Sequence, residues 1–231
     1  SKELIPSLNK LYTSLLNKSN EFNDYVKIGR THLQDATPIL LGQEFSGYAE
    51  QIRNCINRLD KSLEEMVELA IGGTAVGTGI NTHHKFGENV SKEISKYCNL
   101  PFIEAVNHFE AQATQDKSVY LSASLKVLAV SLTKIANDIR LLGSGPRAGL
   151  GELKIPAVQP GSSIMPGKVN PVICESLIQI CAQVIGNDAT INQGGLGSYF
   201  ELNVMLPLIG SNLLESINIL SNGTIMFTEK L

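Results

Sequence analysis

The sequence lacks an excess of charge of either sign. It contains 19 Lys and Arg against 22 Asp and Glu in 231 residues, and it has no block of basic residues. Proteins that bind nucleic acid or an anionic membrane surface usually carry clustered Lys and Arg, so the composition argues against both partners. Any anion that this protein binds must be recruited by a local group of residues.

Cysteine is scarce, and its spacing excludes the common metal-binding motifs. The four cysteines, which never form a C-x-x-C pair, are Cys55, Cys98, Cys174 and Cys181. Zinc and iron–sulfur sites need convergent thiols or imidazoles, which this spacing does not supply. We therefore expect no zinc or iron–sulfur site, and buried, reduced thiols. Such thiols fit the cytoplasm, or the mitochondrial matrix of a eukaryote.

Several other signals are missing. There is no signal peptide, and no apolar run is long and uninterrupted enough to span a membrane. The absence of G-x-S-x-G argues against acyl-enzyme chemistry. The G-x-G at 77–79 follows no strand pattern and so does not support a dinucleotide site. Because the helical pattern begins directly at the first residue, we expect residues 1–231 to be the middle of a longer protein.

A convincing series of strands is also absent, and long helices dominate the pattern instead. The clearest stripe has apolar residues in alternating steps of four and three: Leu121, Leu125, Leu128, Leu132, Ile135, Ile139 and Leu142. This alternation is typical of a helix packed in a bundle. Similar stripes predict helices over 4–25 and 52–70. The predicted fold class is therefore all-α, a bundle of long helices.

The longest helix is predicted from about 109 to 142, where the Gly-Ser-Gly-Pro segment at 143–146 ends it. Two further helices are predicted over 172–193 and 200–221. The last one is apolar around most of its circumference, which predicts a central position in a bundle or an oligomer. Pro207 is expected to kink this helix or to mark a local break in it.

Three loops rich in Gly, Thr, Ser and Asn interrupt the helices, at 29–38, 72–81 and 161–171. Connections in helical bundles can be short and plain, so specialised loops on rigid helices indicate binding loops. The only strand structure expected is a minor hairpin within 72–82 or 147–155.

Loop 161–171, GSSIMPGKVNP, combines a flexible backbone with reactive side chains. Lys168 supplies a positive charge and Asn170 an oriented amide, which suits a small carboxylate. Ser162 or Ser163 would become reactive if Lys168 and backbone N–H groups stabilised its oxygen. The alternative is an ordinary surface loop with turn serines, a solvated lysine and a turn asparagine.

His32 lies in the loop at 29–38, in a predicted turn before Pro38. An imidazole held by a carboxylate is a good base, and Glu175 is the candidate carboxylate, in the first turn of the helix after loop 161–171. Two alternatives stay open: His32 bonded to local backbone, and Glu175 stabilised by the helix N-terminus.

The chain resembles the fumarase/aspartase superfamily through GSSIMPGKVNP and three further blocks. They are KIGRTHLQDATPILLGQEFSGY (27–48), GGTAVGTGIN (72–81) and KIANDIRLLGSGPRAGLGEL (134–153). These three blocks resemble class II fumarases or aspartases, and the resemblance runs through essentially the whole chain.

Smaller differences favour the fumarases within this superfamily. His32 is the usual fumarase residue, and Cys174-Glu175 and the segments 108–111 and 199–203 also resemble fumarases. Val172 is nearer to the aspartases. The resemblance therefore favours a class II fumarase, with aspartate ammonia-lyase as the alternative.

The resemblance implies a fold, an assembly and an activity for residues 1–231. It implies the central helical domain of a homotetramer whose active sites are shared between subunits. It also implies cofactor-free, reversible hydration of fumarate to L-malate, a reaction of the tricarboxylic acid cycle, on a small dicarboxylate substrate.

The resemblance also assigns roles to individual residues. Ser162 would take the C3 proton of malate, and His32, paired with Glu175, would handle water at C2. The implied substrate-binding residues are Thr31, Ser163, Lys168, Val169 and Asn170.

The family's upstream Ser-, Thr- and Asn-rich blocks and its small C-terminal domain are absent from residues 1–231. The implied residues are therefore expected to form only part of each site. If the chain is truly truncated, the alternative is a non-catalytic helical core for oligomerisation.

Overall fold

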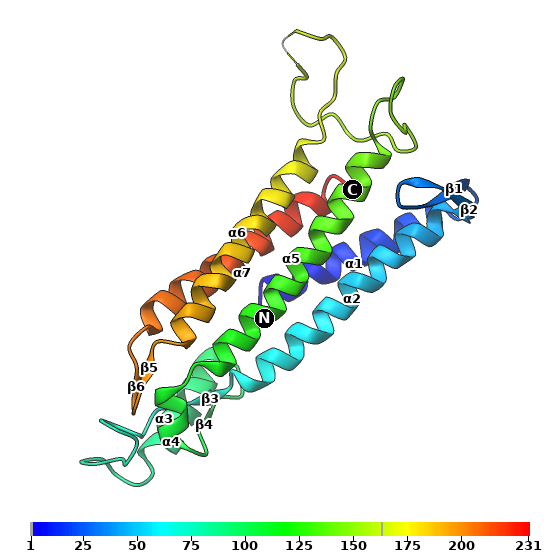
Figure 1. The fold of residues 1–231 in the computed structure, drawn as a ribbon. Helices are drawn as coiled ribbons and strands as arrows, with labels where there is room; N and C mark the ends of the chain where they lie inside the picture. Colours follow the sequence, from blue (N-terminus) through cyan, green and yellow to red (C-terminus); the bar gives the residue numbers. More distant parts are fainter. Residues whose placement is uncertain (1, 163) are drawn as a thin grey trace. The chain divides into compact units, whose positions relative to one another are not determined.

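Five long helices make up most of the part of the chain that the computed structural model describes, residues 2–162 and 164–231 (Figure 1). They are α1 (Leu4–Glu21), α2 (Leu41–Glu65), α5 (Asp116–Leu142), α6 (Val172–Gly195) and α7 (Leu206–Thr228). Two shorter helices are α3 (Phe86–Cys98) and α4 (His108–Ala113). Ser163, one of the predicted substrate-binding residues, lies outside the described residues.

Short strand pairs connect these helices. The antiparallel pairs are β1 (Val26–Thr31) with β2 (Gln34–Leu40) and β5 (Ser198–Tyr199) with β6 (Leu202–Asn203), and β3 (Glu68–Leu69) runs parallel to β4 (Ile103–Glu104). The all-α prediction is confirmed, because helices dominate and the strands are few. The position of the expected hairpin was wrong: it forms over 26–40, and the described residues of 72–82 and 147–155 contain no strand.

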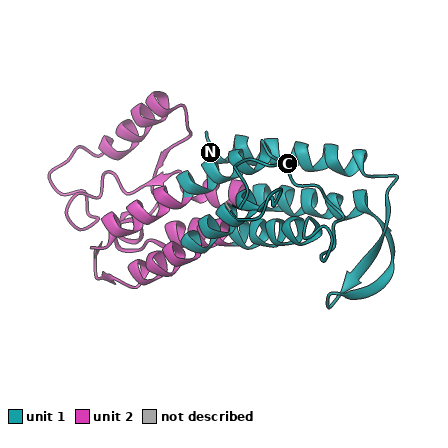
Figure 2. Ribbon diagram, turned by 90° about the horizontal axis from the view of Figure 1, so that it is seen from above, with its two compact units in different colours: residues 1–57, 127–184, 217–231 teal, residues 58–126, 185–216 magenta. Residues whose placement is uncertain are grey.

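The chain divides into two compact units, which Figure 2 colours separately. Unit 1 comprises Ser1–Asn57, Val127–Val184 and Ile217–Leu231, and unit 2 comprises Arg58–Lys126 and Ile185–Ser216. In unit 1, the β1–β2 hairpin joins α1 to α2 (Figure 1). Unit 2 contains α3, α4 and the two shorter strand pairs.

The predicted apolar stripe of α5 is confirmed. All seven of its residues are buried, and Leu128, Leu132 and Ile135 in unit 1 are completely inaccessible to solvent. Burying one such side chain contributes about 1.5–3 kcal/mol, so the stripe is a major source of stability. The alternating steps of four and three predicted the buried face correctly, because this spacing keeps the apolar residues of the stripe on one face of the helix.

The predicted start of the longest helix was wrong by several residues. The Asn107 side chain accepts hydrogen bonds from the backbone N–H groups of Phe109 (3.0 Å) and Glu110 (3.1 Å), so α4 begins there as a separate helix. Thr114 is extended and ends α4, and α5 begins only at Asp116. Its 27 residues give a length of about 40 Å.

Two other helix predictions also need correction. Pro207 lies in the first turn of α7 rather than in its interior, where its missing N–H would have no partner in any case. It therefore marks the start of the helix and gives no reason for a kink. No apolar stripe predicted helix α3, because its buried residues are the small Gly87 and Ser91.

By length and composition alone, α5 would be long and apolar enough to cross a membrane. Half of that apolar stretch is buried within the described chain, and the core helix of a soluble protein has the same properties. Its burial agrees with the bundle predicted from its stripe.

The thiols of Cys174 and Cys181 are buried, as predicted, and burial raises the pKa of each to about 11. At pH 8 only about one molecule in a thousand would carry the reactive thiolate at either position. We expect iodoacetamide to leave both unmodified in the folded protein and to label both after denaturation in urea. Peptide mass spectrometry measures this, with the partly exposed Cys98 as the internal comparison. Rapid labelling of Cys174 in the folded protein would contradict the prediction.

Candidate active site

The turn that carries His32 has an unusual backbone. Strands β1 and β2 pair as far as Thr31 and Gln34, which leaves His32 and Leu33 as a two-residue turn. Their φ angles are +56° and +60°, the left-handed values of a type I′ turn. Asn and Gly usually occupy such turns, because larger side chains are strained there. The turn presents His32 at an exposed tip, where Leu33 is 73% exposed.

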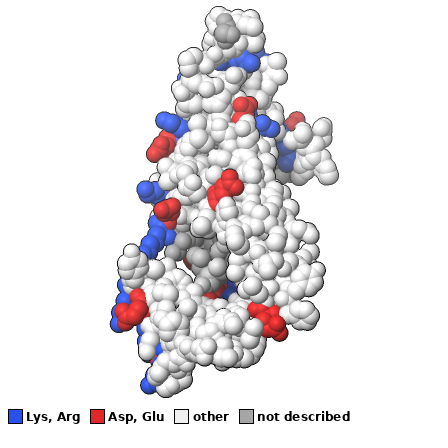
Figure 3. Space-filling view, turned by 90° about the vertical axis from the view of Figure 1, so that its left-hand side faces the viewer, with Lys and Arg blue, Asp and Glu red and all other residues white. Residues whose placement is uncertain are grey.

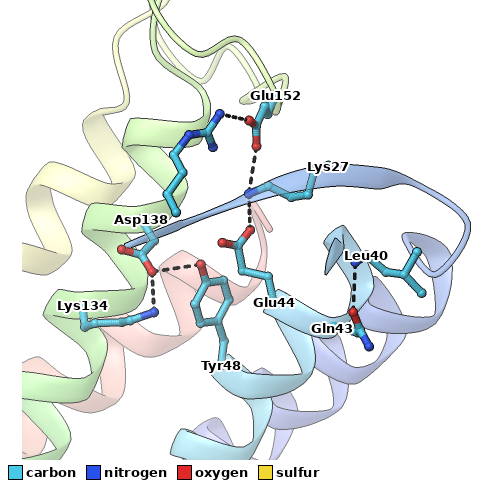
Figure 4. Close-up of polar contacts among 9 residues, drawn as sticks. Lys27, Leu40, Gln43, Glu44, Tyr48, Lys134, Asp138 and Glu152 are labelled. Carbon is cyan, nitrogen blue, oxygen red and sulfur yellow. Dashed lines mark hydrogen bonds and ion pairs between the residues drawn. The ribbon is translucent and has the colours of Figure 1, made fainter. Parts of the chain in front are cut away.

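Four charged side chains hold this hairpin through strand β1 (Figure 4). Lys27 Nζ lies 2.8 Å from Glu44 Oε2 and 2.9 Å from Glu152 Oε2. An Arg30 guanidinium nitrogen lies 2.5 Å from Glu152 Oε1. Glu44 belongs to α2 and Glu152 follows α5, so the hairpin is attached both to α2 and to the segment after α5.

The ion pairs decide the charge state of Glu152. Burial acts to raise its pKa, but hydrogen bonding and charge from Arg30 and Lys27 together lower the pKa below the ordinary value of a glutamate. The hydrogen bond to Glu152 raises the pKa of Arg30 in return. Folding lowers the pKa of Glu152, so its ionised carboxylate stabilises the folded chain fully at pH values above the ordinary pKa of a glutamate. This stabilisation is lost as the pH falls through the lowered pKa.

Ser162 lies in a turn that provides two hydrogen-bond donors. Its Oγ accepts hydrogen bonds from the backbone N–H groups of Ile164 (3.2 Å) and Met165 (3.4 Å). Donors of this kind stabilise a negative charge that develops on the oxygen. This arrangement is the one that a reactive serine requires, although structural turn serines can form it too.

The backbone brings the two ends of this loop together. A Cβ atom placed on Gly161 would lie only 2.1 Å from the Lys168 carbonyl oxygen, so the close approach requires glycine. The Lys168 N–H donates to the Met165 carbonyl (3.4 Å). Ser162 and Lys168 therefore belong to one closed loop. Lys168 and Val169 are exposed, and Asn170 is half-buried just before α6.

Glu175 lies in the first turn of α6, half-buried, and its N–H donates to the Pro171 carbonyl (3.1 Å). Within the described part of the chain, no hydrogen bond or ion pair joins its carboxylate to the His32 imidazole, and neither group has another such partner. One copy of the chain therefore does not form the predicted pair. Thr31 lies beside His32 and is also exposed.

Unit 1 contains a cavity of about 350 Å³ that lies apart from the described site residues predicted from the sequence. Its walls are mainly apolar and include Phe22, Phe45 and Ile155, together with Glu152 and the inert thiol of Cys174. None of the described site residues predicted from the sequence lines it. Among residues 2–162 and 164–231, no three His, Cys, Asp or Glu side chains gather in a metal-binding arrangement.

The four charged residues that hold the hairpin were not predicted from the sequence. Arg30 and Glu152 are 122 positions apart, so no local pattern connects them. The two basic residues of the segment KIGR were the only available signal, and they do not identify their partners. Only the folded chain shows that Glu152 contacts the segment that carries His32.

Comparison with known proteins identifies the family to which the chain belongs. A family model described as lyase matches residues 1–186. The chain is 52% identical over 229 residues to the class II fumarate hydratase of Neisseria meningitidis serogroup A, covering 99% of this chain and 50% of that protein. It is also 52% identical over 229 residues to the mitochondrial fumarate hydratase of Dictyostelium discoideum, covering 99% of this chain and 47% of that protein.

Comparison with solved structures agrees with the sequence comparison. The crystal structure of recombinant class II fumarase from Schistosoma mansoni matches with a TM-score of 0.95 and 40% sequence identity. The match covers 99% of this chain and 51% of that one. The chain thus spans about half the length of the relatives that it matches.

Proposed function

We propose that this chain, which belongs to the lyase family matched over residues 1–186, is the central helical domain of a fumarate hydratase. The observation that carries the proposal is the 52% identity over an alignment that covers 99% of the chain and so includes its loops. A shared helical scaffold requires only the apolar pattern, whereas the loops carry the reactive side chains. The proposed reaction is the reversible addition of water to fumarate, which gives L-malate.

In the direction from malate to fumarate, Ser162 Oγ takes the proton from C3. The electron pair left on C3 spreads onto the adjacent carboxylate, which gains negative charge. Lys168 and backbone N–H groups stabilise that charge. Because these groups are held in place before the charge develops, they lower the barrier more than mobile water would. The hydrogen bonds from Ile164 and Met165 to Ser162 Oγ support its role as the base.

Loss of the hydroxyl completes the reaction. The C2 hydroxyl accepts a proton through His32, leaves as water, and the double bond of fumarate forms. Glu175 fixes the tautomer of His32. Thr31, Ser163, Lys168, Val169 and Asn170 bind the dicarboxylate. His32 and Glu175 lack partners within one described chain, which supports a pair formed between two subunits.

The proposed assembly is a homotetramer with shared active sites. Helix α6 carries two charged residues in 24, and α7 carries one in 23. Figure 3 shows one face on which charged side chains are sparse. Large apolar side chains are nevertheless exposed on these helices, including Leu214 (68%), Ile185 and Ile225. Exposed apolar surface of this kind favours contact with further copies of the chain. We place the protein in the cytoplasm, or in the mitochondrial matrix of a eukaryote.

The test uses the native protein that contains this chain, and it compares L-malate with L-aspartate. We expect the ultraviolet absorbance of fumarate to rise with L-malate and to stay constant with L-aspartate. Turnover of L-aspartate alone would instead identify an ammonia-lyase. If neither substrate is converted while light scattering shows a stable tetramer, the chain serves as an oligomerisation core and the catalytic proposal is wrong.

A further inference from the structure

The side chains of Lys27, Arg30, Glu44 and Glu152, hereafter the hairpin clamp, have no role in the chemical steps proposed above. They are nevertheless well protected from solvent, and only 9% of the Lys27 side chain is exposed. Charged groups are costly to bury unless they are paired, so this arrangement depends on its balance of two cations and two carboxylates.

Glu152 is attached firmly to the end of α5. Its own N–H and that of Leu153 donate to the Leu142 carbonyl, at 2.8 and 3.2 Å. The Gly151 N–H donates to the Ser144 carbonyl at 2.9 Å. These bonds fold the chain after α5 back onto the helix end, so the Glu152 carboxylate projects from a fixed piece of backbone.

This carboxylate contacts the hairpin along strand β1. Glu152 Oε1 contacts Arg30, and Glu152 Oε2 contacts Lys27, which also contacts Glu44 at the start of α2 (Figure 4). His32 follows Arg30 by only two residues, and within the described residues no side-chain hydrogen bond or ion pair holds the exposed turn itself. The position of the imidazole is therefore set mainly at the clamp.

We propose that Glu152 is a positioning residue for His32: its carboxylate fixes the hairpin against the end of α5, from which the chain continues to loop 161–171. This inference rests on the proposed function for its catalytic consequence, but the geometric part stands separately. Without the Glu152 charge, Lys27 and Arg30 would face Glu44 as their only carboxylate in the clamp. Their mutual repulsion would shift strand β1, and the turn would move with it.

The catalytic test is Glu152→Gln in the native protein that contains this chain. The amide keeps the size of the side chain but removes its charge. We expect kcat to fall about 10- to 100-fold, because a displacement of about 1 Å at a catalytic group has an effect of this size. KM for L-malate should change little, since the clamp does not touch the substrate. Glu152→Asp keeps the charge and should restore part of kcat.

The matched control is Glu21→Gln. It removes the same charge from the same unit at an exposed ion pair with Lys18, so kcat should be unchanged. Equal loss of kcat in Glu21→Gln and Glu152→Gln would overturn the proposal. A loss that Glu152→Asp does not relieve at all would also count against it.

The geometric test follows the imidazole signals by NMR after labelling of histidine. The chain contains four histidines, of which His32 alone lies in unit 1. Glu152→Gln should shift and broaden the His32 signal and leave the signals of His83, His84 and His108 unchanged. An unchanged His32 signal would overturn the proposal. If the unsubstituted protein lacked malate turnover while the His32 signal still responded to Glu152→Gln, the proposed function would fail and the positioning role would stand.

Discussion

Replacing Ser162 with alanine is expected to reduce the conversion of L-malate to fumarate by about 10²- to 10⁴-fold, the usual contribution of a positioned base. The substitution removes the oxygen that accepts hydrogen bonds from the backbone N–H groups of Ile164 and Met165. The effect should fall on kcat, because the proton transfer occurs in the transition state. Steady-state kinetics of the native protein that contains this chain, with fumarate absorbance as the signal, provide the measurement.

Two further variants separate chemistry from loop structure. Ser162→Cys retains an ionisable acceptor at the same place and should recover part of the activity that Ser162→Ala loses. Ser46→Ala, at an exposed position in α2, serves as the control and should retain full activity. Full activity in Ser162→Ala would exclude Ser162 as the base, and loss of activity in Ser46→Ala would show that the assay reports folding instead.

Replacing Asp188 with alanine is expected to reduce the free energy of unfolding of unit 2 by about 2–3 kcal/mol. Asp188 is 4% exposed in α6, and its carboxylate accepts hydrogen bonds from Ser122 (2.8 Å), Lys126 (2.5 Å) and Asn192 (3.0 Å). Alanine would leave the buried Ser122 hydroxyl without its acceptor. Lys126 is partly exposed, so its charge can turn toward water, which keeps the cost below that of a fully buried pair.

Urea unfolding measures this effect through the midpoint of the transition at constant slope. Asp188→Asn keeps an acceptor for Ser122 and should fall between the alanine variant and the unsubstituted protein. The control is Glu88→Ala, also in unit 2, which breaks an exposed ion pair with Lys92 and should leave the midpoint in place. Equal midpoints for Asp188→Ala and Glu88→Ala would show that the buried network does not stabilise the unit.

The hairpin at 26–40 illustrates a limit of the sequence analysis. Every residue of β2 from Gln34 to Pro38 is exposed, so the alternating apolar pattern of a half-buried strand is absent. The strands pair instead through backbone hydrogen bonds across the two-residue turn and through the clamp at Lys27 and Arg30. Neither interaction leaves a periodic signal, and the segment was read as a loop.

The candidate site shows the same division. Ser162, Lys168 and Asn170 were recognisable because their residue types stand together in one short loop whose composition excludes regular structure. Glu152 was not recognisable, because its importance comes from contacts with residues more than 100 positions away. The predicted pairing of His32 with Glu175 stays a prediction, since one chain does not bring them together.

The sequence by itself determined the long helices and the chemical character of the loops. Burial along α5 depends on a spacing of three and four residues, and that spacing is a local property of the chain. Only the tertiary structure decided the left-handed turn at His32, the separation of α4 from α5 and the contact between Glu152 and the hairpin. Distance along the chain explains the last of these, because Arg30 and Glu152 are 122 positions apart and become neighbours only after folding. The first two depend on local backbone geometry and capping, which leave no periodic apolar signal.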